Sequence, residues 1–297
     1  MVLIGHQKQW EFLTKSLEAG KISHAYLFEG QDKLGKRTLA VEFAKRILKE
    51  DITRRQHPDY VFIEPEKKEI KINQIRDFIW RLSLKSSSGL PKIGIIDQAH
   101  CLNSEAQNCF LKTLEEPPGD AIIILITAYP QMLVPTILSR CEVIKFYPLG
   151  QKEIEQCLKE QNIAKKAIEE IGRISMGKPG VAIDLTSFPP KLEKRRKIIT
   201  DLIKILNASI SSRFQYAKSI SEDIEGVEEI LDSWLWYFHQ AFLFRITQGQ
   251  RLEKTNSVKK SISKLSRVLK LIEETRFLIF RTNVNSRLAL ETLIMEF

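Results

Sequence analysis

The sequence predicts an α/β fold for the first half of the chain and helices alone for the second half. Apolar segments rich in β-branched and aromatic residues alternate with amphipathic segments of helical period up to about residue 149, and no strand-like segment follows. A glycine-rich phosphate-binding pattern joins the first strand to the helix after it. These observations predict a parallel sheet covered by helices on both faces.

Five segments are predicted as strands because each is short, nearly continuously apolar and rich in β-branched or aromatic side chains: residues 25–29, 60–64, 92–97, 121–127 and 142–147. Strands without polar alternation are typical of a parallel sheet that is buried on both faces. The last of them ends near Pro148.

Helical patterns fill the rest of the chain. Two or three short ones lie in residues 151–190, which are interrupted at 177–180 (GKPG) and at Pro189 and Pro190. Further on, an aromatic-rich stretch at 234–244 is expected in a helix core, and an apolar stripe has helical spacing: Val258, Ile262, Leu265, Leu269 and Ile272. We therefore expect an α/β domain over residues 1–149, a small helical domain over 150–190 and a larger one over 191–297.

Composition excludes several classes of protein. The 297 residues are 43% hydrophobic and 28% charged, as in ordinary folded proteins and unlike disordered ones. The longest apolar run, residues 121–128, is too short to span a bilayer, and no secretory leader is recognised, so we expect a cytoplasmic protein without membrane contact. The four cysteines include no CxxC pair, so neither a zinc site nor a disulfide framework is expected.

The net charge of +9 is compatible with a nucleic-acid partner and does not establish one. Two segments, residues 191–197 and 251–270, concentrate cations. They could neutralise DNA phosphates, or they could be solvated helix faces. The second interpretation is preferred because no pattern of stacking aromatic residues accompanies them.

Residues 30–36 (GQDKLGK) match the phosphate-binding pattern G-x-x-x-x-G-K. Gly30 and Gly35 would let backbone N–H groups surround phosphate oxygens, and Lys36 would reach the β- and γ-phosphates. The next residue is normally Ser or Thr, whose hydroxyl binds Mg²⁺, but here it is Arg37, which cannot ligate a cation. Thr38 lies about 100° further round the helix. The pattern predicts a P-loop and leaves binding of ATP or ADP with Mg²⁺ open.

Two further strand ends fit the same site. Asp97 ends an apolar strand, where it would hold Mg²⁺ through water, although Gln98 follows in place of the usual Glu and cannot accept a proton from the attacking water. Thr127 ends the next strand. Its hydroxyl could lie beside a γ-phosphate or make a local hydrogen bond, and the sequence favours neither.

Several segments together resemble the bacterial clamp-loader proteins of the AAA+ family, and most of all their delta-prime group. The resemblance rests on the P-loop and on residues 4–7 (IGHQ), 24–28 (HAYLF), 111–118 (LKTLEEPP), 135–141 (PTILSRC), 283–285 (NVN) and 288–291 (LALE). It spans nearly the whole chain, and the combination of LEEPP with SRC is its most specific part.

The resemblance implies a five-subunit ring that opens a sliding clamp and places it on primed DNA. The partners would be a gamma- or tau-like ATPase, a delta-like clamp opener, the clamp and the DNA. Arg140, flanked by Ser139 and Cys141, would be an arginine finger that completes the ATP site of a neighbouring subunit. The helices of residues 150–190 would be a lid, and those of 191–297 a collar that holds the ring together.

Three departures from the family pattern point to a subunit that is not itself a motor. The family's zinc module of four cysteines is missing, and residues 50–56 occupy its place. Arg37 and Gln98 replace the residues that bind metal and polarise water in the hydrolysing subunits. Val181 stands where those subunits carry a nucleotide-sensing arginine. Two alternatives stay open, which are a gamma-like subunit that hydrolyses ATP and a DNA-binding protein that forms no ring.

Overall fold

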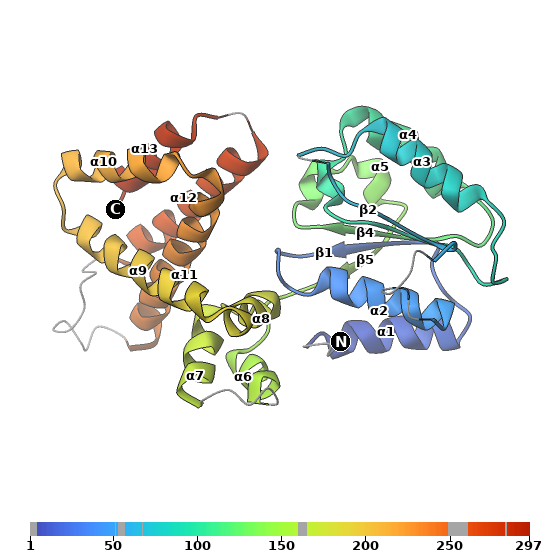
Figure 1. The fold of residues 1–297 in the computed structure, drawn as a ribbon, viewed down its shortest axis with the longest axis horizontal. Coiled ribbons are helices and arrows are strands. Elements are labelled where there is room, and N and C mark those ends of the chain that lie inside the picture. The colour runs from blue at the N-terminus through green and yellow to red at the C-terminus, as the bar shows by residue number, and fades with distance from the viewer. Residues whose placement is uncertain are drawn as a thin grey trace. The chain divides into compact units, whose positions relative to one another are not determined.

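The computed structural model describes residues 5–50, 52, 57–66, 68–159, 165–248, 261–282 and 284–297. The chain divides into two compact units, Met1–Ile183 and Asp184–Phe297, and each is described by itself (Figure 1).

The first unit is built on a five-stranded sheet, as the sequence predicted. The strands are β1 (Ala25–Glu29), β2 (Tyr60–Ile63), β3 (Ile93–Ile96), β4 (Ile122–Thr127) and β5 (Glu142–Lys145). Their order is β2-β3-β4-β1-β5, and every pairing is parallel. The carboxyl ends of all five strands therefore meet at one edge of the sheet.

Helices cover both faces of this sheet (Figure 1). On one face lie α1 (Gln7–Glu18) and α2 (Lys36–Leu48), and on the other lie α3 (Ile72–Ser83), α4 (Ser104–Glu115) and the short α5 (Pro135–Leu138). Short 3-10 turns occupy Ala99–Cys101 and Pro130–Met132. The inner strands β1, β3 and β4 are buried on both faces, to which their successive side chains point in turn, whereas three of the four residues of the edge strand β5 are exposed. Phe28 packs in the core with Phe43 of α2, while Leu27 packs in the core with Phe78 and Phe110.

Three helices follow the sheet in the first unit: α6 (Gln151–Lys159), α7 (Lys165–Ile174) and α8 (Pro179–Ser187). The sequence predicted two or three here. Gly177, with a φ of 78°, accepts the N–H of Leu149 at 2.8 Å and so ties the turn before α8 to the segment after β5. The boundary between the two units falls inside α8, at Ile183 and Asp184. The division into three domains at residues 149 and 190 stays a prediction.

The second unit consists of α9 (Pro189–Leu206), α10 (Ile210–Ser221), α11 (Ile224–Gln248), α12 (Ile262–Arg281) and α13 (Ser286–Met295). Its core includes Trp234 and Phe238, both fully buried, whose ring centroids lie 5.2 and 4.9 Å from that of Phe297. Asn285 accepts the N–H of Leu288 and caps α13, so part of the NVN segment is a helix start.

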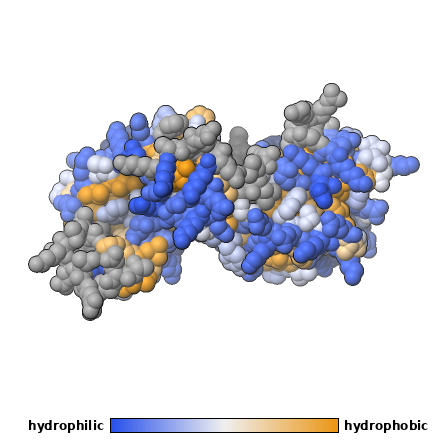
Figure 2. Space-filling view, turned by 90° about the horizontal axis from the view of Figure 1, so that it is seen from below, coloured by the Kyte–Doolittle hydropathy of each residue, from blue (hydrophilic) through white to orange (hydrophobic). Residues whose placement is uncertain are grey.

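Within the predicted apolar stripe, Leu265 and Ile272 are buried, but Ile262 is nearly half exposed at the start of α12 and Val258 lies outside the described residues. On the face seen in Figure 2, patches of apolar side chains appear in orange over this second unit, at the left of the view.

The first of the two basic segments is not simply a solvated face. Lys194 of α9 pairs with Glu229 of α11 at 2.8 Å, and Arg195 is buried. Residues 251–260 of the other basic segment lie outside the described residues. Among the helices that are described, none is long and apolar enough to cross a bilayer.

Candidate functional site

The predicted phosphate-binding residues gather at the carboxyl edge of the sheet. Gly30 follows β1, Thr127 ends β4 and Asp97 follows β3, and these three strands are adjacent. The N–H of Gly30 donates to the carbonyl of Thr127 at 3.2 Å, which ties the start of the P-loop to the neighbouring strand. The predicted residues therefore lie together at one edge of the sheet, and their role in binding nucleotide stays a prediction.

The P-loop has a conformation that requires its glycines. Gly35, the N-cap of α2, has a φ of 90°, a value that L-residues with a side chain rarely adopt. At Gly30, with a φ of 154°, a Cβ atom would lie 2.5 Å from the carbonyl oxygen of Phe146. Lys33 also has a positive φ, of 64°. With these conformations the loop leads into the N-terminus of α2, where backbone N–H groups can bind an anion.

Lys36, the first residue of α2, is only 6% exposed. Its ammonium donates to the carbonyls of Gly30 and Gln31, at 2.6 Å each. Because an ammonium has three donors, these two bonds leave one for a phosphate oxygen. Burial lowers the pKa of Lys36, although the nearby Asp32 and Asp97 oppose this effect.

Arg37 turns toward the ends of β2 and β3. Its Nη1 lies 2.9 Å from Oε2 of Glu64 and 3.5 Å from Oδ2 of Asp97. Its Cζ lies 4.4 Å from the centroid of the Phe62 ring, which is within the range of a cation–π contact. Glu64 follows β2 directly, and sequence analysis did not single it out.

Asp97 is 13% exposed and accepts the backbone N–H of Gln98 at 2.9 Å. Burial raises its pKa, and the opposing effects of that hydrogen bond, Arg37 and Lys36 do not cancel the rise. Gln98 itself has a φ of 49°, and its side-chain oxygen lies 3.9 Å from the thiol of Cys101. The amide oxygen is thus engaged with the turn that follows β3.

Thr127 is buried, and its hydroxyl has local partners. It accepts the N–H of Tyr129 at 3.0 Å and lies 3.1 Å from Nδ1 of the buried His100. This geometry matches the local hydrogen bond that was one of the two interpretations of the sequence. Thr38 is partly buried on α2, one residue beyond Arg37.

The turn before α8 and the start of that helix lie against the P-loop. Gly180 donates its N–H to the carbonyl of Lys33 at 2.9 Å, and a Cβ atom at Gly180 would lie 2.9 Å from the same oxygen. Lys178, two residues earlier, is buried and close enough to Lys36 to lower the pKa of that lysine. The contact between the start of α8 and the P-loop thus places a second buried lysine near this loop.

Arg140 lies at the opposite edge of the sheet. It precedes β5, which runs parallel to β1, so it is at the amino edge while the P-loop is at the carboxyl edge. A strand rises about 3.3 Å per residue, which puts Arg140 roughly 15 Å from the carboxyl edge. It cannot touch a phosphate bound at this chain's own P-loop.

The Arg140 side chain is held by three acceptors. Nη2 lies 2.5 Å from Oε1 of Glu115, and Nη1 donates to the carbonyl of Thr136 at 2.9 Å and to the hydroxyl of Ser139 at 3.3 Å. A third of the side chain is exposed.

Cys141 packs against the core, and burial raises the pKa of its thiol to about 12. Cys141 is therefore a neutral packing residue.

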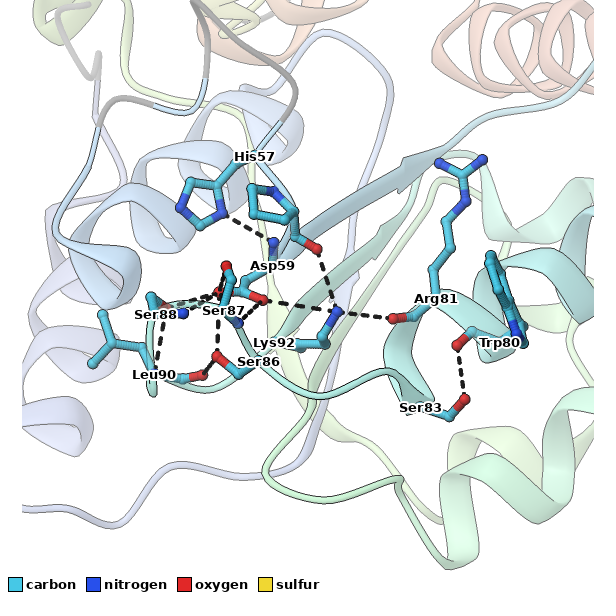
Figure 3. Close-up of polar contacts among 11 residues, drawn as sticks. His57, Asp59, Trp80, Arg81, Ser83, Ser86, Ser87, Ser88, Leu90 and Lys92 are labelled. Carbon is cyan, nitrogen blue, oxygen red and sulfur yellow. Dashed lines mark hydrogen bonds and ion pairs between the residues drawn. The ribbon is translucent and has the colours of Figure 1, made fainter.

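A buried polar cluster joins β2 and β3 at the amino edge (Figure 3). Asp59 accepts N–H and O–H groups of Ser87 and Ser88 at 2.8 to 3.1 Å and lies 3.7 Å from Nζ of Lys92. Burial would raise the pKa of Asp59, but the hydrogen bonds from Ser87 and Ser88 outweigh it and lower the pKa. The same two strands carry Glu64 and Asp97 at their other ends.

For the part of the chain that the structure describes, no group of three or more His, Cys, Asp or Glu side chains is placed to hold a metal ion. Most of residues 50–56, which replace the zinc module, lie outside that part. The absence of zinc stays a prediction.

A parallel sheet of this order with a P-loop after β1 is the architecture of an AAA+ module. A DNA polymerase III gamma-subunit-related protein from Thermotoga maritima superposes with a TM-score of 0.52 at 19% identity over 97% of each chain. A RuvB variant from the same organism superposes with a TM-score of 0.50 at 21% identity, over 67% of this chain and 64% of its own. These likenesses concern the fold alone.

Sequence comparisons define the family. A family model described as DNA polymerase III, delta subunit, matches residues 5–150. The DNA polymerase III subunit delta′ of Bacillus subtilis is 30% identical over 244 residues, which cover 77% of this chain and 70% of that protein. The delta′ subunit of Pseudomonas aeruginosa is 27% identical over 308 residues, covering 92% and 91%. The tau subunit of Escherichia coli is 30% identical over 205 residues, 62% of this chain and 32% of its own. The chain belongs to the bacterial DNA polymerase III delta-prime family of AAA+ clamp-loader proteins.

Proposed function

We propose that the chain is a non-motor subunit of a DNA polymerase III clamp loader, which supplies Arg140 to the ATP site of a neighbouring subunit. Its partners are a gamma- or tau-like ATPase and a delta-like clamp opener in a cytoplasmic ring that loads a sliding clamp onto primed DNA. The relatives named delta′ and tau support membership of such a complex.

The position of Arg140 carries this proposal. The residue is partly exposed and lies at the edge of the sheet away from its own P-loop, so phosphates that it contacts must belong to another chain. A guanidinium is planar and always charged, and it suits the oxygens of a transferring γ-phosphoryl group. In nucleotide hydrolases an arginine of this kind contributes about 10³–10⁵ in rate.

The chain's own site supports the non-motor role. Hydrolysis needs a group that orients or deprotonates water beside the γ-phosphate. Gln98 replaces the usual carboxylate, and its oxygen faces the Cys101 thiol. Arg37, which replaces the metal-binding hydroxyl, pairs with Asp97. Intrinsic ATPase activity is therefore expected to be absent or very slow.

A second candidate is a gamma- or tau-like subunit that hydrolyses ATP itself. The glycine conformations of the P-loop and the buried Lys36 favour it, because both suit phosphate binding. The test that separates the two is the ATPase rate of a loader reconstituted with clamp and primed DNA. The non-motor role predicts that Arg140→Ala lowers the rate at least tenfold and that Lys36→Ala changes it less than twofold. The motor role predicts that Lys36→Ala lowers it.

A further inference from the structure

We propose that Arg37 replaces Mg²⁺ at this P-loop, so that the site binds a nucleoside diphosphate or triphosphate without a divalent metal. This inference concerns the chain's own nucleotide site and does not depend on the role of Arg140. It follows from a disagreement between the residues present and the metal that P-loop proteins of this fold normally bind.

Neither of the two protein groups that would hold Mg²⁺ is free to do so. The hydroxyl that normally follows the P-loop lysine is replaced by Arg37 itself. The second group, the Asp97 carboxylate, is paired with the same arginine, at 3.5 Å from Nη1. Mg²⁺ demands oxygen ligands and carries two positive charges. A guanidinium beside Asp97 therefore occupies the metal position and also repels the metal. The metal does not fit this site.

Three contacts fix Arg37 in this place. Glu64 accepts a hydrogen bond from Nη1 at 2.9 Å, and Asp97 forms an ion pair with the same nitrogen. The Phe62 ring lies against the guanidinium. Because Glu64 and Phe62 belong to the end of β2, the arginine spans two adjacent strand ends. Its side chain leads toward β2 and β3, away from the loop carbonyls that Lys36 contacts.

The phosphate cradle itself is kept. The glycine conformations curve the loop around the N-terminus of α2, and Lys36 has one donor left beyond its two bonds to loop carbonyls. Lys178 is a second buried lysine in the turn before Gly180, whose N–H donates to the Lys33 carbonyl of the loop. Arg37 supplies its positive charge beside Asp97, where the metal would otherwise lie.

The test is the affinity of the full chain for ADP and ATP, measured by titration calorimetry in excess EDTA and in excess MgCl₂, for the wild type and for Arg37→Thr. We expect the wild type to bind ADP in EDTA, with an affinity that Mg²⁺ raises less than twofold. Arg37→Thr, which restores the hydroxyl and frees Asp97, is expected to bind at least tenfold more tightly in Mg²⁺ than in EDTA.

Arg46→Thr is the matched control, because Arg46 is an exposed arginine on the same helix that pairs with Glu18 far from the P-loop. It should behave as the wild type does. Three results would overturn the inference: a wild type that binds ADP at least tenfold more tightly in Mg²⁺, a wild type that binds ADP in neither buffer, or an Arg37→Thr variant that is folded by circular dichroism and gains nothing from Mg²⁺.

Discussion

The Glu115 carboxylate lies 2.5 Å from Nη2 of Arg140, so a single ion pair joins the LEEPP and SRC segments. Glu115 is the last residue of α4, and Arg140 lies in the turn between α5 and β5. The C-terminus of α4 adds the negative end of its helix dipole beside the guanidinium. Two segments about 25 residues apart in sequence therefore form one surface feature, whose centre is the proposed trans-acting arginine.

Glu115 is expected to position Arg140 for its neighbour. Glu115→Gln removes the charge that holds the guanidinium, so the arginine samples more rotamers and contacts the neighbouring phosphate less often. We predict a three- to tenfold lower kcat of the reconstituted loader ATPase with little change in KM. Combined with Arg140→Ala, the substitution should cause no further loss, because both act through one contact. Additive losses would show that Glu115 acts elsewhere.

Asp59 is expected to stabilise the strands that carry Glu64 and Asp97. Asp59→Asn leaves the buried Lys92 without its counter-charge and should lower the free energy of unfolding by about 3–5 kcal/mol. The folded pKa of Asp59 is lowered, so its ionised form stabilises the fold above a pH of about 4, the unfolded pKa, and this contribution is lost as the pH falls below it.

Denaturant titrations of wild type and Asp59→Asn between neutral and acid pH measure this contribution. The stability difference should shrink as the pH falls. Asp77→Asn breaks only an exposed pair with Arg81 at 2.9 Å and should cost less than about 1 kcal/mol. A pH-independent difference for Asp59→Asn would contradict the assigned charge state.

Gly180 is expected to be essential for the contact between α8 and the P-loop. An alanine Cβ would lie 2.9 Å from the Lys33 carbonyl oxygen, so the helix must shift. We predict that Gly180→Ala destabilises the first unit by about 1–3 kcal/mol and increases hydrogen exchange in residues 31–36. At Gly150, where a Cβ would meet only the Glu153 side chain at 3.7 Å, alanine should have neither effect. Equal exchange in both variants would argue against the contact.

Exposed apolar side chains of the second unit are expected to contact other subunits of the ring. Leu288 and Met295 of α13 are 59% and 65% exposed and lie seven residues apart, on one side of the helix. Changing both to Asp should lower assembly of the loader at least tenfold in size-exclusion chromatography. Since both side chains are exposed, the stability of the isolated chain should change by less than about 1 kcal/mol. Phe12→Asp on α1 is the control. If it lowers assembly as much as the double variant does, the prediction that α13 contacts other subunits is contradicted.

The sequence was sufficient to predict the sheet and to place the candidate phosphate-binding residues at the ends of its strands. The five apolar segments became the five strands, and composition marked the buried inner strands β1, β3 and β4 most clearly. The strand order of the structure brings Gly30, Asp97 and Thr127 together. What could not be predicted was the direction of each side chain. Glu64 carries no motif, and it reaches Arg37 only because β2 and β3 are neighbours.

The same limit applies to Arg140 and to the basic segment at 191–197. The quoted motifs contained both Glu115 and Arg140, but their pairing depends on how α4 and the turn before β5 pack. Arg195 looked like one of several surface cations, and it is buried because α9 turns that position inward. Charge runs in a sequence thus do not reveal which members a helix buries.

The ATPase rate of a reconstituted loader with clamp and primed DNA tests the central claim most directly. Arg140→Ala should lower kcat at least tenfold while the complex still assembles, and Arg46→Ala, which also breaks one arginine–glutamate pair, should leave kcat within twofold of the wild type. An intact complex whose rate is unchanged by Arg140→Ala would show that Arg140 does not reach a neighbour's ATP site, and would contradict the account.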